Sequence, residues 1–312
     1  MALVKNLGPC RLSASRWKRI RSFRQKRIAI ITPAWNEGDI IERMLKGNLA
    51  QIEYHEYHFF IGVYPNDGKT SSAVAAMARH NPRVHCVVNA RPGPTSKGQM
   101  LNCVIKEILM HEKESGVEFD ALLMQDAEDV IHPNALMLIN ALLRTFDFIQ
   151  VPVFSLDVKP GQLVAGTYID EFAECHTNDI LVRNYLGAAV PSAGVGTALS
   201  RRLVLEMMCE QEGSLFNEAS VTEDYELGNR AHALGFRAHF GCYYLEINGK
   251  QEFIATREYF PKKFIRSVRQ KTRWTVGIAF QGWKNLGWSG SFIDRYFLFR
   301  DRKGIVINVA AL

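Results

Sequence analysis

The stretch Leu122-Leu123-Met124-Gln125-Asp126-Ala127-Glu128-Asp129 places acidic residues directly after a short apolar run. The apolar residues predict a buried strand of a parallel sheet. Alternate residues of an extended chain face the same side, so we expect Asp126 and Glu128 to point together. Two carboxylates placed in this way suit Mg²⁺ or Mn²⁺. The alternative is a solvated acidic turn, with Asp129 near the N-terminus of the next helix.

Apolar runs and segments of helical period alternate on both sides of this stretch. Strands are predicted at Ile28–Thr32, His58–Tyr64, Val84–Val88, Ala121–Met124 and Phe148–Val153, and helices at Ile40–Ile52, Ser71–Arg79, Gln99–His111 and Ala135–Thr145. This alternation predicts an α/β fold, with a mostly parallel sheet and helices on both of its faces.

The pattern is less regular after Val153. Helices are predicted at Leu163–Tyr185 and Glu223–Leu234, a Gly-rich loop with a strand at Ala188–Leu199, a strand pair at Phe236–Leu245 and a long amphipathic helix at Lys262–Trp283. No low-complexity linker divides the chain, so we expect one continuous fold.

Composition and charge exclude several classes of protein. The 312 residues are 47% hydrophobic and 22% charged, which is typical of a folded domain. No apolar run is long enough to span a bilayer, and no apolar segment of a secretory signal follows the basic N-terminus. The six cysteines lie far apart without a C-x-x-C pair, which favours free thiols in a cytosolic compartment.

The net charge of +6 is concentrated at the N-terminus. Residues 1–27 hold nine Lys or Arg and no acid, which leaves 29 basic and 32 acidic residues elsewhere. General nucleic-acid binding is therefore not expected. The segment Ser15–Arg27 sets Trp17, Ile20 and Phe23 among the charges, which suits a segment on an anionic membrane surface. A disordered or vector-derived tail is an equally open interpretation.

Polar residues follow each predicted strand of the first half, where parallel sheets bind ligands. They are Trp35, Asn36 and Glu37, then Asn66 and Asp67, then Lys97 and Gly98, and finally Asp126, Glu128 and Asp129. The absence of G-x-G-x-x-G and of a P-loop argues against a dinucleotide or NTPase site at this cluster.

Two further motifs lie in the second half. Thr222-Glu223-Asp224 is either a helix N-cap with acids in the first turn or a site for a general base, Asp224. In Gln270-Lys271-Thr272-Arg273-Trp274 the spacing puts Gln270, Arg273 and Trp274 on one helix face. An Arg beside an indole suits a diphosphate and a sugar ring, although an ordinary amphipathic helix has the same pattern.

These motifs together resemble the family 2 glycosyltransferases. Pro33-Ala34-Trp35-Asn36-Glu37, Asn66-Asp67-Gly68, Lys97-Gly98-x-x-x-Asn102, Asp126-Ala127-Glu128-Asp129, Thr222-Glu223-Asp224 and Gln270-x-x-Arg273-Trp274 occur in the family's order. The last motif resembles the processive branch with the cellulose and hyaluronan synthases. The resemblance covers Arg27 to Leu312.

The resemblance implies a GT-A fold and metal-dependent, inverting transfer of a hexosyl or N-acetylhexosaminyl group from a UDP-sugar to a glycan acceptor. Donor-binding residues would be Trp35, Glu37, Asp67, Lys97, Gln270, Arg273 and Trp274. Acceptor-binding residues would be Gly194, Gly196, Thr197, Glu223 and Trp274. Asp224 would be the base, and Asp126 and Glu128 would hold Mg²⁺ or Mn²⁺.

Two departures from the family pattern affect these assignments. The third residue of the metal motif is Glu128 rather than Asp, so Glu128 and Asp129 are both candidate metal ligands. Asn66 stands where the family has its first Asp, which leaves Asp67 alone.

Two other functions stay open, a catalytically inactive nucleotide-sugar-binding scaffold of an envelope complex and a sugar-1-phosphate nucleotidyltransferase. The latter needs a Gly- and Lys/Arg-rich loop after the first strand, where Pro33–Glu37 stands.

The resemblance also divides the chain and places it in the cell. We expect a basic arm at 1–26, a catalytic domain at 27–260 (nucleotide half 27–153, acceptor half 154–260) and an interface helix with a juxtamembrane segment at 261–312. Relatives continue with membrane helices and a cyclic-di-GMP-responsive module. The chain stops at Asn308–Leu312, where such a helix would begin, so we expect a catalytic portion or a shortened homologue.

The expected location of the protein is the cytoplasmic face of a bacterial inner membrane, in exopolysaccharide synthesis, with Phe292, Tyr296, Phe297 and Phe299 as interfacial residues. Packing of these aromatics into the core is the alternative.

Overall fold

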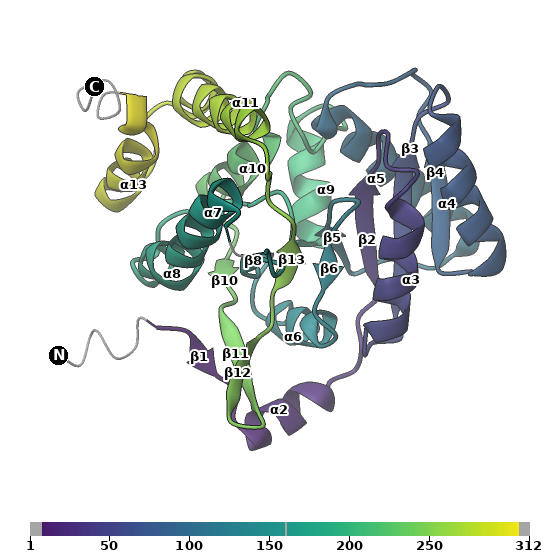
Figure 1. Ribbon diagram of the computed structural model, residues 1–312, viewed down its shortest axis with the longest axis horizontal. Coiled ribbons are helices and arrows are strands. Elements are labelled where there is room, and N and C mark those ends of the chain that lie inside the picture. Colours follow the sequence, from purple (N-terminus) through teal and green to yellow (C-terminus); the bar gives the residue numbers. More distant parts are fainter. Residues whose placement is uncertain (1–7, 160, 306–312) are drawn as a thin grey trace.

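A seven-stranded sheet forms the centre of the molecule (Figure 1). The computed structural model describes residues 8–159 and 161–305, so the expected membrane-helix start at Asn308–Leu312 lies outside the described residues. The strand order is β10-β7-β9-β5-β2-β3-β4. These strands are β2 (Ile28–Pro33), β3 (Tyr57–Val63), β4 (Val84–Val88), β5 (Ala121–Met124), β7 (Phe148–Gln150), β9 (Thr197–Ser200) and β10 (Ala238–Phe240).

Strand β9 is antiparallel to both of its neighbours, whereas the other pairs in this sheet are parallel. Its first residues therefore lie at the same edge as the carboxyl ends of β5 and β2. This reversal brings the Gly-rich loop before Thr197 to the edge where the acidic loop after β5 emerges.

Alternate residues of each strand supply two cores, one on each face of the sheet. Ile28 and Ile30 of β2 pack with α3 (Ile41–Gln51), α4 (Gly68–His80) and α6 (Ala135–Leu142). Ala29 and Ile31 pack with α5 (Lys97–Ser115), α9 (Arg201–Glu210) and α10 (Glu223–Ala233). The expected α/β fold with helices on both faces is confirmed. Helix α9 was not anticipated.

Two small sheets lie beside the main one. One has the order β1-β11-β12, with β1 (Cys10–Arg11), β11 (Tyr243–Ile247) and β12 (Lys250–Phe253). The other has the order β6-β13-β8, with β6 (Val130–Ile131), β13 (Thr256–Glu258) and β8 (Val153–Ser155). The prediction of a strand pair at Phe236–Leu245 was wrong in one respect. β10 and β11 belong to different sheets because β10 pairs with β7 and β11 pairs with β1 and β12.

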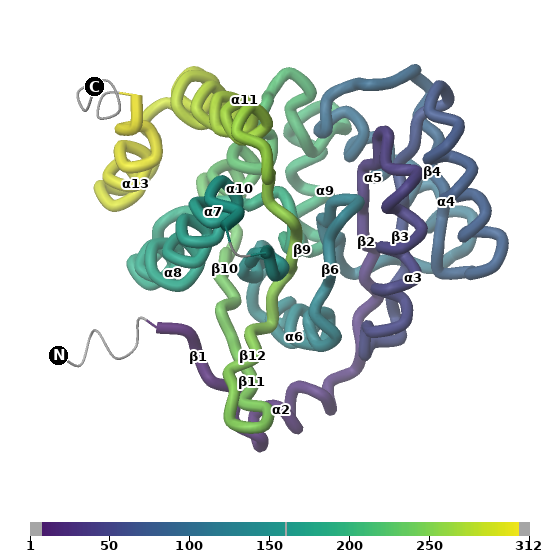
Figure 2. The backbone as a smooth tube through the Cα atoms, viewed as in Figure 1, coloured from purple at the N-terminus to yellow at the C-terminus, as the bar shows by residue number. Residues whose placement is uncertain are grey.

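Helices from the second half gather on the side opposite β4, as the backbone trace shows (Figure 2). One continuous run comprises α7 (Leu163–Glu174), a π-helical turn η1 (Cys175–Asp179) and α8 (Ile180–Tyr185). A second comprises α11 (Phe264–Thr275), the π-helical η2 (Val276–Gln281) and α12 (Gly282–Leu286), and α13 (Phe292–Arg302) follows. Both long runs match the predicted helices. None of the helices in residues 8–159 and 161–305 combines the length and apolar character needed to cross a membrane.

The basic arm folds onto the domain. Helix α2 (Ala14–Arg21) buries Ile20 and packs Trp17 against the first core, and the Arg144 guanidinium lies 4.6 Å from the centre of the Phe23 ring. In the described part of the arm, the structure therefore supports neither a segment lying on a membrane nor a disordered tail. Its apolar side chains face the protein rather than a membrane, and the segment is ordered.

Three imidazoles pack together beneath the β3–β4 edge. His58 Nδ1 and His85 Nε2 are 2.8 Å apart, and the His85 ring stacks on Phe60 and approaches His111. Burial, helped by His58 and His111, lowers the pKa of His85 to about 4. The folded protein therefore binds fewer protons here than the unfolded chain, for which the pKa is near 6.5.

We therefore expect the free energy of unfolding to fall as the pH drops from about 6.5 to about 4, with His85 contributing about 1–2 kcal/mol after allowance for its partial exposure. Urea unfolding at several pH values should show a shallower fall for His85→Gln than for wild type. Val87→Ala on the same strand is the control, because it weakens the core without removing an imidazole. Parallel curves for wild type and His85→Gln would contradict the prediction.

Candidate active site

The acidic loop after β5 is a turn rather than a continuation of the strand. Extended backbone ends at Met124, and the Asp129 amide contacts the Asp126 carbonyl at 3.3 Å. Asp129 is fully buried, and its Oδ2 accepts a 2.7 Å hydrogen bond from the Asp126 amide. The interpretation of this segment as a turn is therefore right, but Asp129 is not solvated. It stabilises the turn from inside the protein and does not cap a helix at the surface. The expected strand geometry of Asp126 and Glu128 was wrong.

Asp126 and Glu128 nevertheless belong to one cluster of carboxylates. Burial raises the pKa of Glu128, and the Asp126 carboxylate raises it further. Burial also raises the pKa of Glu258, to about 8, with Asp126 and Glu128 adding to the effect. The pKa of Glu37 is raised as well, by burial and by the charges of Glu128 and Asp126. The turn therefore presents negative charge that its protein surroundings compensate only in part.

Hard oxygen donors with uncompensated charge fit a divalent cation such as Mg²⁺ or Mn²⁺. Within the described residues, no group of three or more His, Cys, Asp or Glu already has the arrangement of a metal site. Asp126 and Glu128 are accessible at the edge, whereas Asp129 is fully enclosed. The fit therefore rests on Asp126 and Glu128, with Asp129 supporting the turn from below.

Lys97 connects the acidic turn to the second half of the chain. It is the first residue of α5, and its Nζ lies 2.6 Å from Asp126 Oδ1 and 3.4 Å from the Gly194 carbonyl oxygen. Burial alone would lower the pKa of this ammonium, but the carboxylates of Asp126, Glu223 and Asp224 raise it above its ordinary value. Lys97 therefore stays charged and holds acidic groups from both halves together.

Asp224, the predicted base, lies against the Gly-rich loop. Its carboxylate is so close to Gly194 that a β-carbon on that glycine would be 2.5 Å from Asp224 Oδ2. Burial raises the pKa of Asp224, although the charges of Lys97 and Arg273 oppose this. Burial and the Asp224 charge raise the pKa of Glu223 to about 7. Thr222 precedes the helix as predicted but makes no capping hydrogen bond; it packs against Gly277 instead.

The Gly-rich loop reaches the site with only part of its predicted residues. Gly194, at φ +79°, faces Asp224, so this part of the loop reaches the predicted base. Thr197 is fully buried, and its hydroxyl contacts Ser192 and Gln150 at 2.7 Å. Gly196 packs against Thr256 and Val151. Thr197 and Gly196 therefore support the loop from beneath, which corrects the expectation of a direct acceptor contact.

Trp35 forms a half-exposed aromatic wall at the other end of the edge. Its ring meets Tyr64 edge-on with centroids 5.2 Å apart. Asp67 holds the Trp35 loop: Oδ2 accepts a 2.6 Å hydrogen bond from the Asn36 amide, and Oδ1 caps α4 at Thr70. These hydrogen bonds outweigh burial and keep the pKa of Asp67 below its ordinary value.

Asn66 fastens the loop that faces Trp35. Its amide group donates to the Gly93 carbonyl and accepts from the Gly93 amide, both at 2.7 Å. An aspartate cannot make the donating half of this pair. A β-carbon on Gly93 would lie 2.6 Å from Tyr64 and 2.8 Å from Trp35. The departure from the family's Asp thus has a structural role in this chain.

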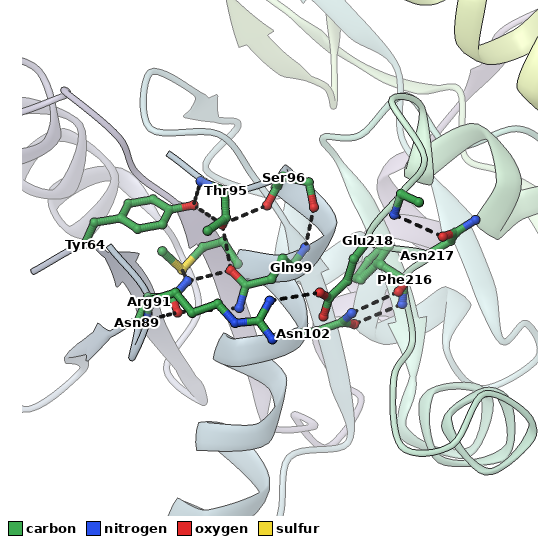
Figure 3. A network of polar contacts seen from close by, with 12 residues as sticks. Tyr64, Asn89, Arg91, Thr95, Ser96, Gln99, Asn102, Phe216, Asn217 and Glu218 are labelled. Atoms are coloured by element: carbon green, nitrogen blue, oxygen red, sulfur yellow. Dashed lines mark hydrogen bonds and ion pairs between the residues drawn. The ribbon is translucent and has the colours of Figure 1, made fainter. Parts of the chain in front are cut away.

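A network of polar contacts connects this loop to the second half of the chain (Figure 3). Tyr64 and Thr95 hydroxyls are 2.7 Å apart, and Thr95 donates to Gln99 at 2.6 Å. Asn102 holds the Phe216 backbone through hydrogen bonds in both directions, and Arg91 lies 3.6 Å from Glu218. The start of α5 is thereby fixed against the loop that precedes Asp224.

The predicted clamp lies on α11. Trp274 packs against Tyr168 and Phe172 with centroid distances of 6.0 Å. It also lines a cavity of about 340 Å³ next to Asp224, together with Ser192 and Tyr225. Arg273 is exposed and close enough to influence Asp224. The Gln270 side-chain oxygen is buried without a hydrogen-bond partner.

The sequence did not reveal that Glu258 lies near the acidic turn, nor that Tyr64 and Gly93 pack against Trp35. Glu258 ends a three-residue strand whose polar sequence gives no strand signal. Tyr64 ends the predicted second strand, and only the close approach of Gly93 shows its role. A strand signal cannot report such contacts between distant loops.

The chain matches a known family and two relatives of known name. The model of the family described as "Glycosyltransferase like family 2" matches residues 25–277. The chain is 41% identical over 297 residues to bacteriophage adsorption protein B of Escherichia coli K12, and equally so to bacteriophage N4 adsorption protein B of E. coli O157:H7. The matches cover 91% of this chain but only 40% of either relative, so the chain spans less than half their length.

The fold is shared with a solved mannosyltransferase, PcManGT from Pyrobaculum calidifontis, in complex with GDP-mannose and Mn²⁺. The TM-score is 0.59 over 95% of this chain and 81% of that one, at 16% identity. At this identity the likeness establishes the GT-A fold.

Proposed function

Because this chain belongs to the family 2 glycosyltransferases, we propose that it transfers a sugar from a UDP-sugar to a hydroxyl of a glycan acceptor, with inversion at the anomeric carbon. The observation that carries the proposal is the meeting of Asp224 with Gly194 and Lys97 at the edge where the acidic turn emerges. A base, an open backbone and a cation lie together there.

Asp224 is the proposed base. Its raised pKa makes the carboxylate a better proton acceptor than a solvated aspartate. Because Gly194 has no side chain, an acceptor hydroxyl can approach the carboxylate. The acceptor oxygen would lose its proton to Asp224 as it bonds the anomeric carbon, while the bond from that carbon to the diphosphate breaks on the opposite face.

The donor would lie along the edge between Trp35 and α11. Trp35 offers a ring face for the uracil, and Glu37 and Asp67 lie beside it for the nucleoside. Lys97 and Arg273 are cations for the diphosphate. A divalent cation bound by Asp126 and Glu128 would stabilise the negative charge of the leaving UDP. The mannosyltransferase of the same fold binds GDP-mannose and Mn²⁺, which supports a nucleotide-sugar donor and a metal.

The surface of α11 and its neighbours suggests attachment to an anionic membrane. Leu163, Phe264, Phe280 and Phe292 are between 56% and 85% exposed. The basic residues Lys262, Lys263, Arg266 and Arg269 on and before α11 are exposed as well. Tyr296 and Phe299 are exposed on α13, whereas Phe297 is buried, which corrects its proposed membrane contact. We place the protein on the cytoplasmic face of a bacterial inner membrane, in exopolysaccharide synthesis within an envelope complex.

Turnover should depend on Asp224. Incubation with a panel of UDP-sugars and candidate acceptors should release UDP from wild type, and EDTA should suppress the release. Asp224→Asn should slow it by about 10²–10⁴-fold because the base is lost. The control is Glu246→Gln, a change to an exposed acid on β11 that the proposed site does not use. UDP binding without turnover of any donor would favour the inactive scaffold, and pyrophosphate release from UTP and a sugar phosphate would favour a nucleotidyltransferase.

Gly194→Ala tests the contact that carries the proposal. The added methyl would collide with Asp224 Oδ2, so we expect turnover to fall by about 100-fold through displacement of the base. Gly187→Ala is a matched control, because Gly187 has φ +70° with open space around its Cα. It should lose stability without a comparable loss of turnover. Equal turnover losses in the two variants would contradict the role of Gly194.

Vesicle flotation tests the membrane surface. Wild type should float with vesicles that contain phosphatidylglycerol, and high salt should release it, because both apolar and ionic contacts hold it. Phe264→Ser with Phe280→Ser should reduce flotation several-fold. Met110→Ser is the control, since Met110 is 51% exposed on a different helix. Flotation that ignores anionic lipid and salt would remove the membrane proposal.

A further inference from the structure

A largely enclosed ion pair between α8 and α13 contacts the residue next to the proposed base. Asp301 accepts two hydrogen bonds from Arg183 Nη1, at 3.0 and 2.9 Å, and one from the Tyr225 hydroxyl at 2.7 Å. The Arg183 side chain is 6% exposed and Tyr225 is 5% exposed. One carboxylate thus joins α8, α10 and α13. Neither the sequence motifs nor the proposed chemistry uses any of these three residues.

This cluster reaches the site by two routes. Tyr225 follows Asp224 in the first turn of α10. Arg183 Nε also donates a 2.5 Å hydrogen bond to the Ala189 carbonyl, in the loop that leads to Gly194. Asp224, Tyr225, Arg183 and Asp301 line the same cavity of about 340 Å³. The base and the glycine beside it are therefore both held by neighbours of one carboxylate.

The first turn of α10 needs such contacts because it lacks a side-chain cap. Thr222 occupies the capping position without the usual hydrogen bond, and its hydroxyl is buried without a partner. Glu226 fixes the opposite side of the turn through Ser220 at 2.7 Å and Asn285 at 2.6 Å. On the side that faces the cavity, Tyr225 supplies the polar contact.

Helix α13 has attachments that do not depend on Tyr225. Arg302 donates to the carbonyls of Gly287 and Gly282 at 2.6 and 3.1 Å. Asp294 accepts a 3.2 Å hydrogen bond from the Ala189 amide and lies 3.1 Å from His232. Loss of the Tyr225–Asp301 hydrogen bond should therefore loosen α10 without detaching α13.

We infer that Asp301 is a positioning residue for transfer: through Tyr225 and Arg183 it holds Asp224 and the Gly194 loop in their working arrangement. This inference rests on the proposed function, in which Asp224 is the base. Asp301 touches neither donor nor acceptor in this scheme, so its loss should affect the rate rather than donor affinity.

Three variants of the full chain weaken the contacts of Asp301 by different amounts. Tyr225→Phe removes only the hydroxyl, Asp301→Asn keeps one accepting oxygen, and Asp301→Ala removes both. We expect kcat to fall by about tenfold in Tyr225→Phe and further in Asp301→Ala, with Asp301→Asn between wild type and Asp301→Ala, at an unchanged donor KM. Amide hydrogen exchange should become faster at residues 224–227 in each variant.

Glu112→Gln is the matched control. Glu112 is 5% exposed at its side chain and accepts two hydrogen bonds from Arg201, at 2.5 and 2.6 Å, away from Asp224. Its loss should lower stability while leaving kcat and exchange at 224–227 unchanged. Tyr225→Phe and Asp301→Asn variants with wild-type kcat and exchange would overturn the inference, even if Asp301→Ala fails to fold. Absence of turnover in wild type would instead count against the proposed function, and the exchange measurement would still decide whether Asp301 holds α10.

Discussion

Lys97 is the charge on which the arrangement of the site depends. It pairs with Asp126 from the first half and lies against Gly194 from the second, while Glu223 and Asp224 keep it protonated. Without this cation, acids from two distant segments would face one another in a partly buried space, where like charges repel strongly. The position of Lys97 at the start of α5 therefore matters as much as its charge. Asn102, one turn further along, fixes that start against Phe216.

The antiparallel strand β9 explains why two halves of different regularity share one site. A parallel strand in its place would put the Gly194 loop at the opposite edge of the sheet. Because β9 runs against β5 and β7, the loop enters beside the acidic turn. Gln150 at the end of β7 then holds the loop through the Ala193 amide and the Thr197 hydroxyl. The buried threonine thus contributes to the site by fixing where Gly194 lies.

Sequence patterns predict the parts of this structure that depend on local periodicity. The strands of the first half, both long helical runs and the polar residues at the strand ends follow from spacing alone. Contacts between loops do not. The pairing of Asn66 with Gly93 and the approach of Glu258 to the acidic turn join segments far apart in the chain, through strands too short or turns too irregular to leave a pattern. The arm shows the same limit, since its charges suggest a surface while its few apolar residues determine that it packs.

Helix α13 takes part in two of the proposals, the membrane-binding surface and the positioning of the base by Asp301. Its inner face carries Phe297, Asp301 and Arg302 toward the domain, and its outer face exposes Phe292, Tyr296 and Phe299. The helix is short and is held to the domain by polar contacts of Asp294, Asp301 and Arg302. Under the membrane proposal, a contact at the outer face would therefore act on the same helix that carries Asp301. Because Asp301 accepts a hydrogen bond from the Tyr225 hydroxyl, it also contacts the turn that carries Asp224. If both proposals hold, Asp301 is one of the contacts through which attachment would act on the position of the base, beside the contacts of Arg183 and Asp294 with Ala189.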